Sequence, residues 1–112
     1  MKEIKAYVHA HRIASVIAAL KASNAWGGAV AGTRHNLTVY VVKGSLLPVD
    51  ARERVFSVEL GDEVVNEYKL ELLCEDEHVV ELVDVIRREA RTGQATAGWI
   101  YVTEVVSATP IA

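Results

Sequence analysis

The segment YKLELLCEDEHVVELVDVIRREARTG, residues 68–93, joins a strand pattern directly to a helix pattern. Apolar and polar residues alternate between 64 and 74, as they do in a β-strand with one buried face. Beyond residue 78 the apolar residues recur at helical spacing: Val79, Leu82, Val83, Ile86 and Ala90. Asp76 is a favourable N-cap residue and Gly93 a favourable stop, so the segment predicts a long strand followed by an amphipathic helix.

The start of the chain shows the same order of patterns. Residues 3–9 alternate as a strand does, and an apolar stripe at helical spacing follows over residues 13–20. Residues 37–43, LTVYVVK, are mostly β-branched or aromatic and predict a second strand. Residues 99–106 have the pattern of a last strand, while 55–60 alternates weakly and indicates one arm of a hairpin.

The predicted order of elements is strand, helix, strand, strand, helix, strand, which is the ferredoxin-like βαββαβ arrangement. We therefore expect an α+β fold, in which the split βαβ topology gives an antiparallel four-stranded sheet with both helices on one face. The other face would carry these residues: Tyr7, His9, Thr38, Tyr40, Lys69 and Glu71. An exposed face of this partly aromatic kind usually meets a ligand or another subunit.

The composition indicates one small globular domain spanning residues 1–112. Hydrophobic residues make up 51% of the chain and charged residues 24%, which is not the balance of a disordered protein. The net charge of −3 argues against a nucleic-acid partner. The single cysteine, Cys74, excludes an internal disulfide and a CxxC redox pair. Because the sequence has neither a membrane-spanning run nor a signal-peptide pattern, we expect a cytoplasmic protein.

Four blocks of the sequence resemble the PII (nitrogen regulatory protein P-II) signalling proteins. They are MKEIKAYVHAHRIASVIAALKAS at 1–23, LTVYVVKG at 37–44, the segment 68–93 and GWIYVTEV at 98–105. The blocks occur in the order and spacing of PII proteins and cover most of the chain apart from about residues 24–36. We expect those residues to form an extended loop, in which Trp26 contacts another subunit or covers a ligand.

The resemblance implies a homotrimer with ligand clefts between its subunits. Residues 44–62 correspond to the PII T-loop and residues 92–98 to the B-loop, and PII proteins bind ATP or ADP, and 2-oxoglutarate, in such clefts. The residues that the resemblance places in the cleft are Thr38, Gly44, Glu71, Thr92, Gly93, Gly98 and Trp99. The residues of the T-loop-like segment expected to dock on a partner are Arg52, Arg54 and Phe56. The implied function is a regulator that senses a small ligand and controls an enzyme or a membrane transporter.

The sequence departs from the PII pattern where that family holds phosphate groups. The B-loop lysine is replaced by Trp99, and the two C-terminal arginines are replaced by Pro110 and Ala112. Each charge-assisted contact to phosphate contributes about 1.5–3 kcal/mol, so the loss of three argues against ordinary ATP binding. The glutamine that helps to hold Mg-ATP and 2-oxoglutarate is Pro48 here. We therefore expect a degenerate ATP/2-oxoglutarate site, with an adenine nucleotide as a weakened candidate and the identity of the ligand left open.

The histidines support a second interpretation, a trimeric metal-binding or metal-tolerance protein. His9 and His11 stand two residues apart at a strand end, where both side chains lie on one side and can share a divalent metal such as Zn²⁺ or Cu²⁺. His35, in the extended loop, is a further candidate ligand, whereas Cys74 is more typical of a buried core residue. Two solvated histidines are the simpler explanation of the pair, and both interpretations stay open.

No arrangement of residues in the sequence is typical of catalysis. Serine and histidine occur, but without a nucleophile elbow or a partnered acid at suggestive positions. The acidic run Glu75–Glu77 precedes a helix, where carboxylates favour the helix dipole. We therefore expect a binding protein and not an enzyme.

Overall fold

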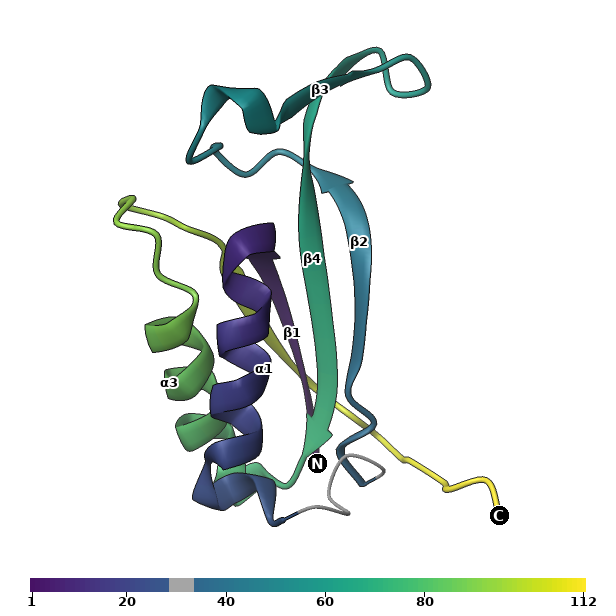
Figure 1. Cartoon of the computed structure of the whole chain (residues 1–112). Coiled ribbons are helices and arrows are strands. Elements are labelled where there is room, and N and C mark those ends of the chain that lie inside the picture. Colours follow the sequence, from purple (N-terminus) through teal and green to yellow (C-terminus); the bar gives the residue numbers. More distant parts are fainter. Residues whose placement is uncertain (29–33) are drawn as a thin grey trace.

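The computed structural model describes residues 1–28 and 34–112 and shows a sheet covered on one face by helices (Figure 1). The strands are β1 (Lys2–His9), β2 (Thr38–Gly44), β3 (Arg54–Ser57), β4 (Asp62–Cys74) and β5 (Trp99–Glu104). Helices α1 (Ile13–Ala22) and α3 (Val79–Glu89) lie side by side against the sheet. The short 3₁₀ turns are η1 (Ala10–Arg12), η2 (Asn24–Trp26), η3 (Ala51–Glu53) and η4 (Asp76–His78). None of the described helices is long and apolar enough to cross a membrane.

The strands follow the order β2-β4-β1-β5, every neighbouring pair is antiparallel, and β3 pairs with the first part of β4. The unit β1-α1-β2 is split by β4, which lies between β1 and β2. The unit β4-α3-β5 is split by β1, which lies between β4 and β5. The predicted α+β, ferredoxin-like arrangement is therefore confirmed. The described sheet has one strand more than the four expected, because the chain turns back at Gly61 and pairs β3 with β4.

The hydrophobic core fills the space between the sheet and the two helices. Alternate residues of β1 and β4 point into it, and one stripe of each helix meets them, as the two sequence periods require. The side chains with almost no exposed surface include Ile4, Val8, Val16, Leu20, Leu70, Leu72, Leu82 and Ile86. Cys74 belongs to this core, where burial raises the pKa of its thiol. Cys74 is therefore a packing residue and not an accessible metal ligand.

The start of α3 differs from the prediction at Asp76. The 3₁₀ turn η4 occupies residues 76–78, and α3 begins at Val79 without a side-chain cap. The Asp76 carboxylate is instead paired with the terminal ammonium group of Met1 at 2.8 Å, which lowers the pKa of Asp76. Asp76 therefore fastens the start of β1 to the β4–α3 connection, because the extended backbone of Glu75 and the following tight turn bring the two together.

Two apolar residues of α3 test which face of the helix packs against the core. Leu82 has no exposed surface, whereas Val80, two positions earlier, is 81% exposed. Leu82→Ala should lower the free energy of unfolding by about 2–5 kcal/mol, because it removes buried methyl groups and leaves a cavity. Val80→Ala should change it by less than about 0.5 kcal/mol. Urea unfolding followed by circular dichroism measures both, and equal losses for the two variants would contradict this orientation of α3.

Candidate functional site

Two connecting segments meet at the end of the sheet where β2 ends and β4 begins. The first is residues 44–62, which include η3 and β3, and the second is residues 92–98, between α3 and β5. The side-chain amide of Gln94 donates hydrogen bonds to the backbone carbonyls of Leu47 and Pro48, at 3.0 and 3.4 Å. Gln94 thus connects the two segments directly. No sequence pattern singled it out, since its partners are backbone atoms that any residue could supply.

A pocket of about 450 Å³ opens between β1, the end of α3 and the 92–98 segment. Three of the residues expected in a ligand cleft line it: Gly93, Gly98 and Trp99. Gly98 has a steric role there, because a Cβ atom at this position would overlap the backbone carbonyl oxygen of Tyr7. The absence of a side chain therefore lets the 92–98 segment pack directly against β1.

The same pocket is lined by three cations, Arg87, Arg88 and Arg91. Arg87 and Arg88 both pair with Asp84, at 2.9 and 3.0 Å, and this lowers the pKa of the Asp84 carboxyl group. The resemblance to PII proteins predicted phosphate-binding cations only in the B-loop and the C-terminal segment. The arginine-rich end of the helix was visible in the sequence, but its place beside the pocket depends on how α3 packs on the sheet.

A smaller pocket of about 280 Å³ lies at the base of the 44–62 segment and shares Trp99 with the first. Gly44, another residue expected in the cleft, lines it together with Glu67. Glu67 is only 4% exposed, and its Oε2 atom accepts a hydrogen bond from the Leu46 backbone N–H at 2.9 Å. Any side chain on Gly44 would overlap this carboxylate. Glu67 therefore holds the start of the 44–62 segment, although its strand alternation alone indicated a solvent-facing side chain.

The open face of the sheet carries Thr38 and Glu71, which line neither pocket of the described structure but are direct neighbours in the β2–β4 register. The Glu71 Oε1 atom accepts a hydrogen bond from the Tyr40 hydroxyl at 2.7 Å and lies 3.1 Å from Lys69 Nζ. The Tyr40 hydrogen bond lowers the pKa of Glu71, and Tyr40 and Glu71 together raise the pKa of Lys69. The carboxylate is thus already paired within its own chain.

Thr92 completes the group of residues expected in the cleft. Its hydroxyl donates a hydrogen bond to Gln94 Oε1 at 2.7 Å, and it lines neither described pocket. Thr92 therefore orients the side chain that joins the two segments. The structure brings Gly93, Gly98 and Trp99 together, places Gly44 next to them, and puts the remaining cleft candidates elsewhere. Their roles in binding stay predictions.

The three residues expected to dock on a partner lie in the outer part of the 44–62 segment. The Arg52 guanidinium pairs with Asp50 at 2.7 Å, which lowers the pKa of Asp50, and Arg54 lies 3.9 Å from Glu63. Phe56 is 62% exposed. Other apolar side chains exposed on the segment are Leu47, Val49, Val55, Val58 and Leu60. Arg52 is therefore paired within the segment and Arg54 lies near a carboxylate of β4, while the apolar side chains of the segment face solvent.

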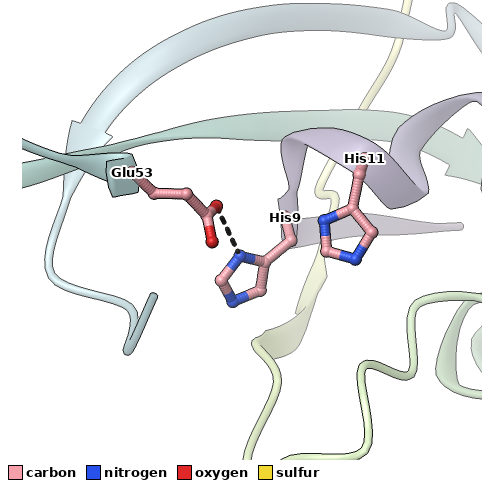
Figure 2. A group of neighbouring side chains, drawn as sticks. All are labelled: His9, His11 and Glu53. Atoms are coloured by element: carbon pink, nitrogen blue, oxygen red, sulfur yellow. Dashed lines mark ion pairs between the residues drawn. The ribbon is translucent and has the colours of Figure 1, made fainter. Parts of the chain in front are cut away.

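The two histidines at the end of β1 lie beside a carboxylate from the 44–62 segment (Figure 2). His9 ends β1 and is 1% exposed, and His11 lies in the exposed turn η1. The Oε2 atom of Glu53 is 3.5 Å from His9 Nδ1. The spacing of the histidines predicted their pairing but not the approach of Glu53, because nothing near Glu53 in the sequence indicates that η3 folds back over β1.

His35, the third histidine proposed as a metal ligand, is engaged elsewhere. Its ring stacks on the indole of Trp26 with 4.3 Å between ring centroids. Its Nδ1 lies 2.7 Å from the Leu73 carbonyl oxygen and its Nε2 lies 2.9 Å from the Trp26 carbonyl oxygen. Because both ring nitrogens lie at hydrogen-bond distance from backbone carbonyl oxygens, His35 has a structural role in the described structure, and its assignment as a metal ligand stays a prediction.

The extended loop predicted at about residues 24–36 is described only in part. Residues 29–33 lie outside the described residues, so the prediction is not assessed for them. Trp26 is 2% exposed and belongs to the core, where it supports His35. Within a single chain its indole therefore packs in the hydrophobic core, whereas the sequence predicted that it contacts another subunit or covers a ligand.

Comparison with known proteins gives one informative match. No family model matches the chain. The chain is 32% identical over 71 residues to the nitrogen regulatory protein P-II of Cyanidium caldarium, and the match covers 63% of this chain. The match also spans 63% of that relative's length, which is less than two thirds of it. The resemblance to PII proteins seen in the residues is thereby confirmed as a distant one.

The structural role of His35 can be tested against a histidine without such contacts. His35→Ala should lower the free energy of unfolding by about 1–3 kcal/mol, because it removes a buried hydrogen bond to a backbone carbonyl and the ring that stacks on Trp26. His78→Ala is the control, since no side-chain hydrogen bond of His78 is found within the described structure, and it should change stability by less than about 0.5 kcal/mol. Thermal or urea unfolding of metal-free protein measures both. Equal stability of the two variants would contradict the role given to His35.

Proposed function

We propose that this protein is a non-enzymatic, PII-like regulator that binds a small ligand and controls a partner protein through residues 44–62. The observation that carries the proposal is the direct connection between the ligand pocket and that segment. Gln94 belongs to the pocket lining and binds the backbone of Leu47 and Pro48. A ligand that shifts the 92–98 segment would therefore shift the 44–62 segment with it. The similarity to a nitrogen regulatory protein supports the same assignment.

The proposed assembly is a homotrimer in which the open faces of the three sheets meet. This face carries aromatic side chains that a single chain leaves exposed: Tyr40 at 41%, Trp99 at 59% and Tyr101 at 48%. Burial of such rings is a favourable source of association free energy, and a continuous exposed apolar face is typical of an interface. Trp99 also lines both pockets, so an assembly through this face would bring a second subunit next to the ligand.

The proposed ligand is a small anion, because three arginines from α3 and the residues after it line the pocket with positive charge. Arg87 and Arg88 are shared with Asp84, while no acidic partner of Arg91 is found in the part of the chain that the structure describes. The cations that bind phosphate in PII proteins are absent at Trp99 and in the C-terminal segment. A nucleotide with fewer phosphates, or a small carboxylate, is therefore a better candidate than a triphosphate.

The proposed output of the regulator is docking of residues 44–62 on another protein, such as an enzyme or a membrane transporter. Phe56, Val58 and Leu60 are exposed at the hairpin formed with β4. Apolar side chains at the tip of an anchored segment are suited to insertion into a partner, while its base stays fixed by Glu67. The proposal contains no chemical reaction.

A trimeric metal-binding protein is the second candidate function. The cluster formed by His9, His11 and Glu53 favours it, because these side chains come from two parts of the chain and converge at one point. This candidate does not exclude regulation, since the cluster lies outside the lining of both pockets.

The proposed trimer predicts a solution mass three times the 12.2 kDa of one chain. Size-exclusion chromatography with light scattering measures this mass directly. Tyr101→Lys should lower the mass toward that of a monomer, because it would bury a charge in the proposed interface. Val80→Lys, on the outer face of α3, is the matched control and should leave the trimer intact. A parent protein that remains monomeric at micromolar concentration would overturn the proposed assembly.

The proposed ligand class predicts binding in calorimetric titrations with AMP, ADP, ATP or bicarbonate. At least one of the four should bind, and ATP should not bind more tightly than ADP, because the usual triphosphate contacts are missing. Arg91→Ala should weaken the binding by about 10–100-fold, the loss expected for one charge-assisted hydrogen bond. Arg52→Ala, in the outer part of the 44–62 segment, is the control and should not change it. The absence of heat with all four compounds would leave the proposed sensor without support.

A further inference from the structure

A buried histidine without a hydrogen-bond partner lies at the end of β1. His9 is 1% exposed, and neither of its ring nitrogens has a hydrogen-bond partner in the described structure. Removing a polar group from water without a new partner is unfavourable, so buried imidazole nitrogens nearly always bind something. The position of His9 therefore calls for a partner that the chain alone does not supply.

Two further side chains offer ligand atoms at the same point. His11 from η1 and Glu53 from η3 approach His9, and one ligand atom from each of the three lies within 4.8 Å of the others. Figure 2 shows the Glu53 carboxylate directed toward the His9 ring, with the His11 ring beside it. The His9 Nδ1 and Glu53 Oε2 atoms are 3.5 Å apart. Ligand atoms bound to one tetrahedral zinc ion lie about 3.3 Å apart, given bonds of about 2.0–2.1 Å, so this pair is already close to a bridging distance.

The remaining adjustment falls on the side chain that can move most easily. His11 is exposed, and no hydrogen bond of its imidazole is found among the described residues. One nitrogen of His11 already lies within 4.8 Å of a ligand atom of each of the other two residues. His9, by contrast, is fixed by burial, and Glu53 is fixed by the turn that carries it.

The η3 turn positions the Glu53 carboxylate through a capping box. The Glu53 Oε1 atom accepts a hydrogen bond from the Asp50 backbone N–H at 2.7 Å, and the Asp50 side chain accepts one from the Arg52 N–H at 2.9 Å. One carboxylate oxygen is thus used for the turn, and the other is left facing His9.

A direct ion pair between His9 and Glu53 accounts for less of this arrangement. At 3.5 Å, the His9 Nδ1–Glu53 Oε2 contact is longer than an ordinary N–H···O hydrogen bond. The pair would also give no role to His11, whose ring lies beside that of His9 with 5.8 Å between the ring centroids. Two imidazoles and one carboxylate, however, form a ligand set that zinc and copper prefer.

We propose that His9, His11 and Glu53 bind one divalent transition-metal ion of the zinc class per chain, with a fourth position left for water or another ligand. The ion would fasten residues 44–62 to the end of β1. The site gives the second candidate function its ligands, and it does not depend on the proposed regulatory function or on the trimer, because all three ligands belong to one chain. Only the consequence for docking of the 44–62 segment rests on that function.

The proposal is tested by titrating the metal-free, full-length protein with Zn²⁺ in competition with a chromogenic chelator. The parent should bind one zinc ion per chain. Glu53→Gln and His11→Gln should each weaken zinc binding by at least about 10–100-fold. Loss of a residue that only hydrogen-bonds to a metal ligand already costs that much affinity. Glu59→Gln in the same segment and His78→Gln in η4 are matched controls, and both should bind zinc as the parent does. These ligand variants alter partly or fully exposed side chains, so the test does not depend on a variant of the buried His9 that fails to fold.

Cleavage of the chain by trypsin after Arg52 and Arg54 provides a second measurement. Zinc should slow this cleavage in the parent and in Glu59→Gln but not in Glu53→Gln, because a fastened segment opens less often. Unchanged zinc affinity in both Glu53→Gln and His11→Gln would overturn the site. Zinc binding without protection from trypsin would overturn the fastening alone. Zinc binding by a protein that is monomeric and binds no anion would overturn the proposed regulator and leave the metal site standing.

Discussion

The pairing of β4 with three other strands is the constraint on which the rest of the structure depends. Its 13 residues pair with β1 over 67–74, with β2 over 65–71 and with β3 over 62–65. Leu70 and Leu72 on one face of β4 have almost no exposed surface and form the floor of the core. Because side chains alternate along a strand, the same register fixes Lys69 and Glu71 on the open face. A shift by one residue would exchange the core with the charged face.

The length of β4 also explains why the candidate site lies at one end of the sheet. β4 begins five residues before its pairing with β1 begins, so its first part projects beyond β1 and carries β3. The 44–62 segment must therefore cross over the end of β1 to reach this projection (Figure 1). Glu67 binds Leu46 at the start of that crossing, and Gln94 binds Leu47 and Pro48 next to it. These contacts bring η3 above His9, and they place the pocket, the segment and the histidines within one region.

The sequence predicted the architecture well because apolar patterns report directly on burial. The alternation in residues 68–74 and the stripe that includes Leu82 and Ile86 each have one buried face, and the structure uses both as expected. Asp76 shows the limit of local rules, since its carboxylate has an alternative partner in Met1 that a capping preference does not consider. His35 shows the same limit, because its place between Trp26 and Leu73 depends on the arrangement of distant backbone carbonyls.

The sequence by itself determined the fold class, the two helix faces and the resemblance to PII proteins, because these depend on periodicity and on the order of local patterns. Only the tertiary structure decided which side chains meet. It placed Arg91 beside a pocket whose expected cations are missing, Glu67 under the base of the 44–62 segment, and Glu53 beside His9. The physical reason is that each of these contacts joins residues far apart in the chain. Their meeting follows from strand register and the path of a connection, and neither is encoded in the spacing of the residues involved.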